Sequence, residues 1–286
     1  MDVDEKTEED EAKGILAPLA KEISSIGSSL SKNRKKRKVS ENLSTVEEIQ
    51  KFAEAKNVGG IISGKGAAIL AMEIKNDQII VGGSDKSVKV VSVETGETIS
   101  VLKGHAKKVC AVSVNSDSTA IVSGSEDGKI IVWGATEQGW EQLTTLEHHE
   151  AAVTGLSFHP HSRLFVASSK DCSWSFCDIE GNVISHIKTN QSVSCISIHP
   201  DGLILATGVE NEINIWDVRS MENVATMKEE GKVVGLNFSE NGYHMASITE
   251  DGTLSLWDLR NVSKISHVSV KGAKSVAFDH SGSYLT

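Results

Sequence analysis

A repeat of about 40 residues constrains this chain more than any other feature. In each repeat, a segment of apolar and small residues ends at a polar turn residue, and a second strand-like segment follows. The five turn residues are separated by 42, 44, 40 and 40 residues: Asp85, Asp127, Asp171, Asn211 and Asp251. Short β-branched runs between turn residues are typical of strands, and this period is typical of the four-stranded blades of a WD-repeat propeller.

The repeat over residues 102–134 is the best specified. We predict strands at Val109–Val114, Ala120–Ser123 and Lys129–Trp133, with a tight turn at Asp127-Gly128. An indole N–H requires an acceptor, and an imidazole carries both a donor and an acceptor. The repeat therefore holds the residue types of a buried hydrogen-bond chain that would stabilise one blade: His105, Ser123, Asp127 and Trp133.

The other repeats depart from this set. His149 holds the position of His105, but Thr189 and Glu229 occupy it in the next two repeats. Val91 and Cys177 replace the tryptophan in the first and third repeats. We therefore expect these blades to depend on stacking and apolar burial more than on buried polar chains.

Residues 64–286 are expected to form an all-β WD-repeat propeller of about five and a half blades, incomplete at its C-terminus. The last, partial unit begins at Lys271 and holds two strands. Before the propeller we predict a disordered acidic and basic extension over residues 1–42. A linker helix is predicted over residues 43–58.

Two features of the N-terminal region support these assignments. Apolar residues recur at roughly helical spacing from Ile15 to Leu30, which indicates either a short amphipathic or oligomerising segment or a partly ordered linker. Pro18 and Gly27 disfavour helix and favour the linker. Thr45 and Glu48 form a capping box at the start of the predicted linker helix.

The charge of the chain is unevenly distributed. The formal net charge is −10, and 31 acids oppose 20 bases from Val39 onward. A propeller this acidic is a poor phosphate binder, so we expect protein partners and no direct sequence-specific nucleic-acid binding. One basic run predicts either a nuclear import signal or a solvated linker: Lys32, Arg34, Lys35, Lys36, Arg37 and Lys38. No apolar run approaches the roughly 18 residues of a membrane span, so no membrane partner is expected.

No catalytic residue, metal site or cofactor site is predicted. The segment 124–129 resembles a phosphate loop, but its spacing is one residue short and Ile130 stands where Ser or Thr would bind magnesium. No G-x-S-x-G motif occurs. The pair Cys172 and Cys177, and the groups His148-His149 and His159-Pro160-His161, lack further ligands. We interpret them as reduced thiols and as structural or solvent-facing histidines.

Several blocks are more specific than the generic repeat. They are HPDGLI at 199–204, FSENGY at 238–243, LWDLR at 256–260 and, before the propeller, RKKRKVSENLSTVEEIQKF at 34–52. In order and spacing these resemble the WD-repeat region of the pre-mRNA-processing factor 19 family, which are U-box ubiquitin ligases and spliceosome scaffolds. The resemblance covers most of residues 64–286.

The resemblance implies a seven-bladed propeller that recruits spliceosomal and ubiquitination-pathway proteins in the nucleus. In the family a U-box and a tetramerising coiled coil precede it, so we expect this chain to be truncated at both ends, with the oligomerisation segment largely absent and no autonomous ligase catalysis. The predicted function is a nuclear splicing scaffold, the recruiting propeller of a U-box E3 ligase. Two alternatives stay open: a complete ligase whose U-box is missing from this sequence, and an unstable truncated product without function.

Partner contact is predicted at the loops that lead into the blades and at the hairpin turns. The candidate residues are Lys107, Lys108, Glu126, Lys170, Asn211, Lys232 and Glu250.

Overall fold

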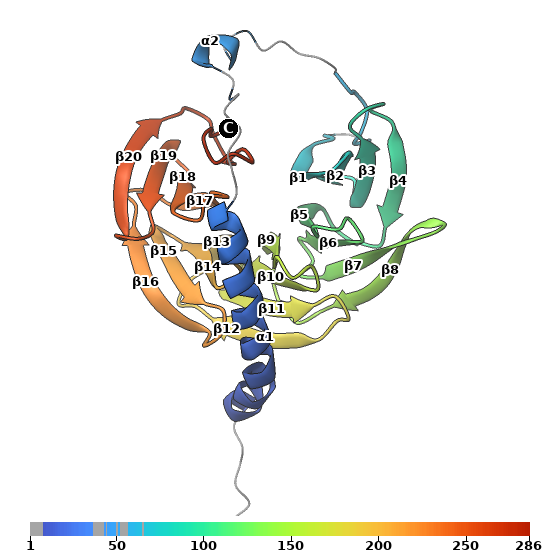
Figure 1. Cartoon of the computed structure of the whole chain (residues 1–286). Helices are drawn as coiled ribbons and strands as arrows, with labels where there is room; N and C mark the ends of the chain where they lie inside the picture. The colour runs from blue at the N-terminus through green and yellow to red at the C-terminus, as the bar shows by residue number, and fades with distance from the viewer. Residues whose placement is uncertain (1–7, 37–42, 44, 50, 52–56, 65) are drawn as a thin grey trace, which may run out of the picture.

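The computed structural model describes residues 8–36, 43, 45–49, 51, 57–64 and 66–286. Five four-stranded antiparallel sheets stand side by side around a centre, as propeller blades do (Figure 1). In every blade the four strands follow one another in sequence order. The predicted all-β propeller is thus confirmed.

The strand bounds follow the predicted repeats. Blade 1 contains β1 (Ile69–Lys75), β2 (Gln78–Gly83), β3 (Ser87–Ser92) and β4 (Thr98–Lys103). Blade 2 contains β5 (Val109–Val114), β6 (Ala120–Ser125), β7 (Ile130–Thr136) and β8 (Gly139–Leu146). Blade 3 contains β9 (Val153–Phe158), β10 (Leu164–Ser169), β11 (Ser173–Asp178) and β12 (Val183–Lys188).

Blade 4 contains β13 (Val193–Ile198), β14 (Ile204–Val209), β15 (Glu212–Asp217) and β16 (Glu222–Lys228). Blade 5 contains β17 (Val233–Phe238), β18 (His244–Thr249), β19 (Thr253–Asp258) and β20 (Ser263–Ser269). Beyond it, Phe278 and Leu285 form one antiparallel bridge, where the two strands of a sixth unit were predicted.

The hydrophobic core lies between neighbouring blades. Trp174 and Phe176 of blade 3 pack with Ile196 and Leu205 of blade 4, and all four are buried. Equivalent clusters join blades 1 and 2, blades 2 and 3, and blades 4 and 5. Because each blade buries its faces against its neighbours, stacking supplies the main apolar stabilisation.

One hydrogen bond ties the turn after the first strand of a blade to the same turn of the next blade. Three such bonds are Asn115 Nδ2 to Ser162 O (3.2 Å), His159 Nε2 to Gly202 O (2.9 Å) and His199 Nε2 to Gly242 O (3.0 Å). His159 Nδ1 also accepts the backbone N–H of His161 (3.1 Å). His159 is therefore a buried structural residue in its neutral form.

Helix α1 (Glu8–Lys36) crosses the face of blades 3 and 4 (Figure 1). The disordered extension predicted over residues 1–42 is therefore wrong between these bounds, and Pro18 lies inside the helix. Tertiary burial outweighs the local disfavour, because Ile23 is buried in the cluster that blades 3 and 4 share. A Cβ at Gly27 would lie 2.4 Å from Leu203 Cδ2, so this glycine allows close approach to blade 4.

Helix α2 (Val46–Ile49) is short. The predicted capping box is present: Glu48 N donates to Thr45 Oγ1 (3.3 Å), and Thr45 N donates to Glu48 Oε2 (2.8 Å). Residues 50 and 52–56 of the predicted linker helix lie outside the described residues. Neither helix, over the residues that the structure describes, is long and apolar enough to cross a bilayer.

Candidate functional site

The face opposite α1 carries the loops between blades and the turns between the second and third strand of each blade; we call it the loop face. Because the strands of a blade are antiparallel, these loops and turns lie at the same end of every blade. Helix α1 contacts the turns at the opposite end, at His161 and Asp201. All seven predicted partner-contact residues belong to the loop face. Lys232 pairs with Glu210 (3.1 Å) and is half-buried. The other six are exposed.

In blade 2 the structure brings three of the four predicted chain residues together. Ser123 Oγ lies 2.8 Å from His105 Nε2 and accepts the indole N–H of Trp133 (2.9 Å). Asp127 instead accepts the backbone N–H groups of Ala106 (3.1 Å) and Lys129 (3.0 Å). Asp127 thus fixes the loops, while the other three residues join the strands.

Blade 5 also has a buried polar chain, although its sequence led us to expect a greater dependence on stacking and apolar burial. Glu229, at the position of His105, accepts the hydroxyl of Ser247 (2.6 Å), and Ser247 Oγ accepts the indole N–H of Trp257 (2.8 Å). Lys264 Nζ donates to Glu229 Oε2 (2.7 Å). A carboxylate therefore replaces the imidazole, and the ammonium balances its charge in the interior.

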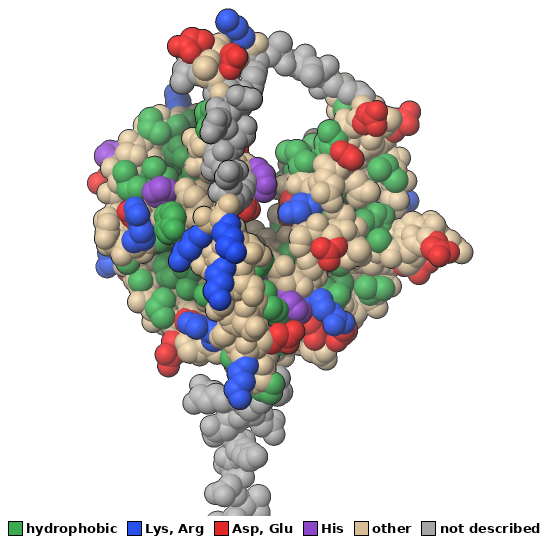
Figure 2. Space-filling view, in the orientation of Figure 1, with side chains coloured by type: hydrophobic (Ala, Val, Ile, Leu, Met, Phe, Trp, Pro, Cys, Tyr) green, Lys and Arg blue, Asp and Glu red, His purple; other side chains and the backbone are tan. Residues whose placement is uncertain are grey.

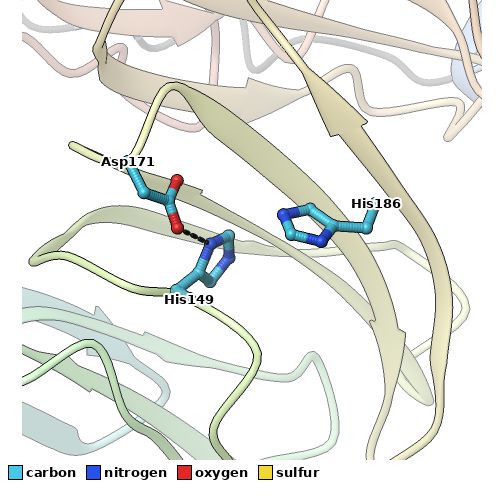
Figure 3. Close-up of side chains that lie close together, drawn as sticks. All are labelled: His149, Asp171 and His186. Atoms are coloured by element: carbon cyan, nitrogen blue, oxygen red, sulfur yellow. Dashed lines mark hydrogen bonds and ion pairs between the residues drawn. The ribbon is translucent and has the colours of Figure 1, made fainter.

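Blade 3 holds a denser polar network, which the sequence did not reveal. His149 Nδ1 lies 2.9 Å from Asp171 Oδ2 (Figure 3). His149 Nε2 lies 3.0 Å from Ser175 Oγ. His186 Nε2 lies 2.7 Å from the hydroxyl of Ser173, which also donates to Asp171. Four segments converge here: the loop before β9, the β10–β11 turn, β11 and β12.

His148 belongs to the same network. Its Nε2 lies 2.8 Å from Ser175 Oγ, and its ring centroid is 4.2 Å from that of His149. Burial lowers the pKa of His148 to about 4, and it also lowers the pKa of His149 despite the nearby Asp171 carboxylate. Both imidazoles are therefore neutral near pH 7.

The prediction that His148 and His149 are structural or solvent-facing overlooked His186. His186 lies on the fourth strand, about 37 residues from the pair, and only the strand register places it opposite Ser175. The useful signal was the alternation of Ser173 and Ser175 along β11, because serines on one face of a strand must meet polar partners when buried.

Blade 4 has a cavity where blades 2, 3 and 5 place His or Glu. Thr189 holds this position, and its hydroxyl donates to the nearby Gln191 carbonyl (2.7 Å). A cavity of about 480 Å³ lies here next to Trp216, and it is lined mainly by polar residues, Thr189 among them. Asn211, one of the predicted contact residues, lines it.

The basic run predicted as an import signal ends α1, and basic side chains gather along this part of the helix (Figure 2). Lys32, Lys35 and Lys36 are exposed, whereas Arg34 pairs with Asp201 (2.6 Å). Arg37 and Lys38 lie outside the described residues.

The four cysteines are free thiols. Burial raises the pKa values of Cys177 and Cys195 to about 12, so these two thiols are protonated and unreactive at neutral pH.

Comparison with known proteins gives consistent matches. Residues 68–286 match the family described as IFT122 first beta-propeller. The chain is 34% identical to pre-mRNA-processing factor 19 homolog 2 of Arabidopsis thaliana, over 99% of this chain and 56% of that protein. It is 33% identical to pre-mRNA-processing factor 19 of Oryza sativa subsp. japonica (95% of this chain, 54% of that protein) and of Mus musculus (96% and 57%). The chain thus spans a little over half the length of these relatives.

Proposed function

Since this chain belongs to the β-propeller family that matches residues 68–286, and resembles pre-mRNA-processing factor 19, we propose that it is a nuclear protein-interaction scaffold of pre-mRNA splicing. Its partners are spliceosomal proteins that bind the loop face. In the same proposal, the propeller recruits partners and substrates for a U-box ubiquitin ligase.

The cavity in blade 4 is the observation that carries the loop-face proposal. It combines an aromatic wall, Trp216, with side-chain amides from Asn190, Asn211, Asn214 and Asn223. A concave site that is mostly polar, with one aromatic surface, suits a side chain or backbone segment of a protein partner. Glu210 and Glu212 also line the site, but each pairs with a lysine, Lys232 (3.1 Å) and Lys228 (3.2 Å). The site therefore favours a polar partner segment that hydrogen-bonds to the amides over one selected by its charge.

The acidic character of the chain supports a protein partner over a nucleic acid. The formal net charge of −10 repels phosphate backbones. The nuclear import proposal rests on the exposed lysines at the end of α1, since Arg34 is engaged with blade 4.

A pull-down from nuclear extract tests the scaffold proposal. The full chain is compared with Thr189→His, which places in the cavity the larger residue type that blades 2 and 3 carry at this position. We expect the wild-type chain to retain splicing proteins and Thr189→His to lose them. Arg163→Ala is the matched control, because Arg163 is exposed and pairs with Glu180 on the α1 face.

Recovery of no splicing protein by the wild-type chain would overturn the scaffold proposal. Equal recovery by wild type and Thr189→His would overturn the assignment of the cavity as the contact site. The ligase part is tested separately, by finding whether the upstream coding sequence encodes a U-box and whether the resulting protein transfers ubiquitin.

A further inference from the structure

Three side chains with metal-ligating atoms gather at one point of blade 3, and the ring of a fourth, His148, lies beside them. His149, Asp171 and His186 each present one ligand atom, and these atoms lie within 4.8 Å of one another. In Figure 3 the rings of His149 and His186 and the Asp171 carboxylate face a common space. The ring centroid of His148 is 4.2 Å from that of His149 and 5.5 Å from that of His186.

Proton positions in this network leave one imidazole nitrogen without a partner. If His149 donates from Nδ1 to Asp171, its Nε2 accepts the Ser175 hydroxyl proton. Ser175 Oγ then has no proton for His148, so His148 Nε2 must donate to it. The lone pair of His148 Nδ1 stays free, and among the described residues this buried atom has no hydrogen-bond partner.

A buried acceptor without a partner is destabilising, and a neutral imidazole with a free lone pair is the form that binds metal ions. Asp171 supplies one negative charge to balance a cation. The cluster therefore has the donors and the charge of a metal site.

We propose that His148, His149, His186 and Asp171 bind a Zn²⁺ ion. Three imidazoles and one carboxylate give the four nitrogen and oxygen ligands that tetrahedral zinc accepts, whereas magnesium and calcium require mainly oxygen ligands. Ser173 and Ser175 contact the ring nitrogens and can orient the ligands, as outer-shell groups do. Bonds of about 2.1 Å require ligand atoms about 3.4 Å apart, so the side chains must move closer together when the ion binds, and the exposed His186 ring has room to turn.

Blade 5 provides an internal comparison. His267 on β20 lies opposite Ser255, as His186 on β12 lies opposite Ser175. There, however, Glu229 is bound by the Lys264 ammonium (2.7 Å), a cation that would repel a metal. His267→Ala therefore removes a histidine from the same position of a blade without touching the proposed site.

Calorimetric titration of the metal-stripped full chain with Zn²⁺ tests the proposal. We expect the wild type to bind one equivalent and to give the visible bands of tetrahedral Co²⁺ when cobalt replaces zinc. His186→Ala should weaken Zn²⁺ binding at least about tenfold and abolish the cobalt bands. His267→Ala should match the wild type in both measurements.

Thermal melts without metal show whether each variant still folds, so that unfolding is not mistaken for a loss of zinc binding. His186 is exposed on an outer strand, so His186→Ala should melt within a few degrees of the wild type. If it does not fold, His148→Gln replaces it, with the same expected loss. The proposal is overturned if the wild type binds no zinc, or if His186→Ala, His148→Gln and His267→Ala all bind it as tightly as the wild type.

Discussion

Arg34 of α1 and Asp201 in the β13–β14 turn form an ion pair of 2.6 Å in which the side chains are only 13% and 9% exposed. The Arg34 guanidinium also lies 5.6 Å from the ring centroid of Tyr243 in blade 5. With Ile23 buried between blades 3 and 4, these contacts fix the segment before the propeller onto the propeller itself. A residue from the basic run is thus part of the folded core.

Arg34→Ala is expected to destabilise the chain by about 3 kcal/mol, because it leaves the Asp201 carboxylate buried without its cation. The free energy of unfolding from urea titration measures the loss, and hydrogen exchange should show faster exchange of α1 amides. Lys35→Ala, at an exposed position of the same turn, should change stability by less than about 0.5 kcal/mol. Equal effects of the two substitutions would contradict the docking of α1.

Glu229→Ala is expected to cost about 2 to 3 kcal/mol, since Ser247 and Lys264 both lose a buried acceptor. Glu229→His should cost less, because a ring nitrogen can accept from Ser247 as His105 contacts Ser123 in blade 2. Chemical denaturation compares them with Glu230→Ala, an exposed neighbour. A loss for Glu229→Ala no larger than for Glu230→Ala would refute the buried chain in blade 5.

Trp133→Ala is expected to cost about 3 to 5 kcal/mol through the cavity it leaves and the lost hydrogen bond to Ser123. Trp140→Ala removes the same atoms from a half-buried position of the same blade and should cost clearly less. Equilibrium unfolding of the two variants side by side measures the difference. A loss under about 1 kcal/mol for Trp133→Ala would rule out the buried chain in blade 2.

The sequence predicted the blades well because their signals are local. Turn residues such as Asp127 and the β-branched runs beside them determine strand positions within a few residues. It predicted α1 poorly, because Pro18 and Gly27 disfavour helix locally, whereas the burial of Ile23 against blade 4 is a tertiary effect. The network of blade 3 was missed for the same reason: it depends on the pairing of β12 with β11.

Substitution in the repeats also misled the sequence-based interpretation. Glu229 was interpreted as a departure from the repeat set that weakens the polar chain, because it is not histidine. In the structure it keeps the acceptor function, and Lys264, about 35 residues further on, supplies the charge balance. Thr189 is a true loss of the imidazole or carboxylate at this position, and it lines the cavity beside Trp216.

The buried ring of His159, which forms a hydrogen bond to the next blade, predicts a loss of stability in mild acid. Burial lowers the pKa of His159 to about 4, whereas an unfolded histidine has a pKa of about 6.5. Between these values the unfolded chain binds more protons, so stability falls as the pH falls from about 6.5 toward 4. The structural reason is that Nδ1 accepts the His161 N–H while Nε2 donates to Gly202 O, so a second ring proton has no acceptor.

His159→Asn isolates this contribution. Asn115 makes the equivalent bond from blade 2 to Ser162 O, so an amide at position 159 should keep the bond to Gly202 without a titrating ring. Urea denaturation at pH 7.5 and pH 4.5 should show that the wild type loses about 2 kcal/mol more than His159→Asn over this interval. Equal losses of stability in the two proteins would contradict a neutral His159 in the folded state. If the buried ring stays neutral while the unfolded chain takes up a proton, the free energy of unfolding must fall more in the wild type than in His159→Asn.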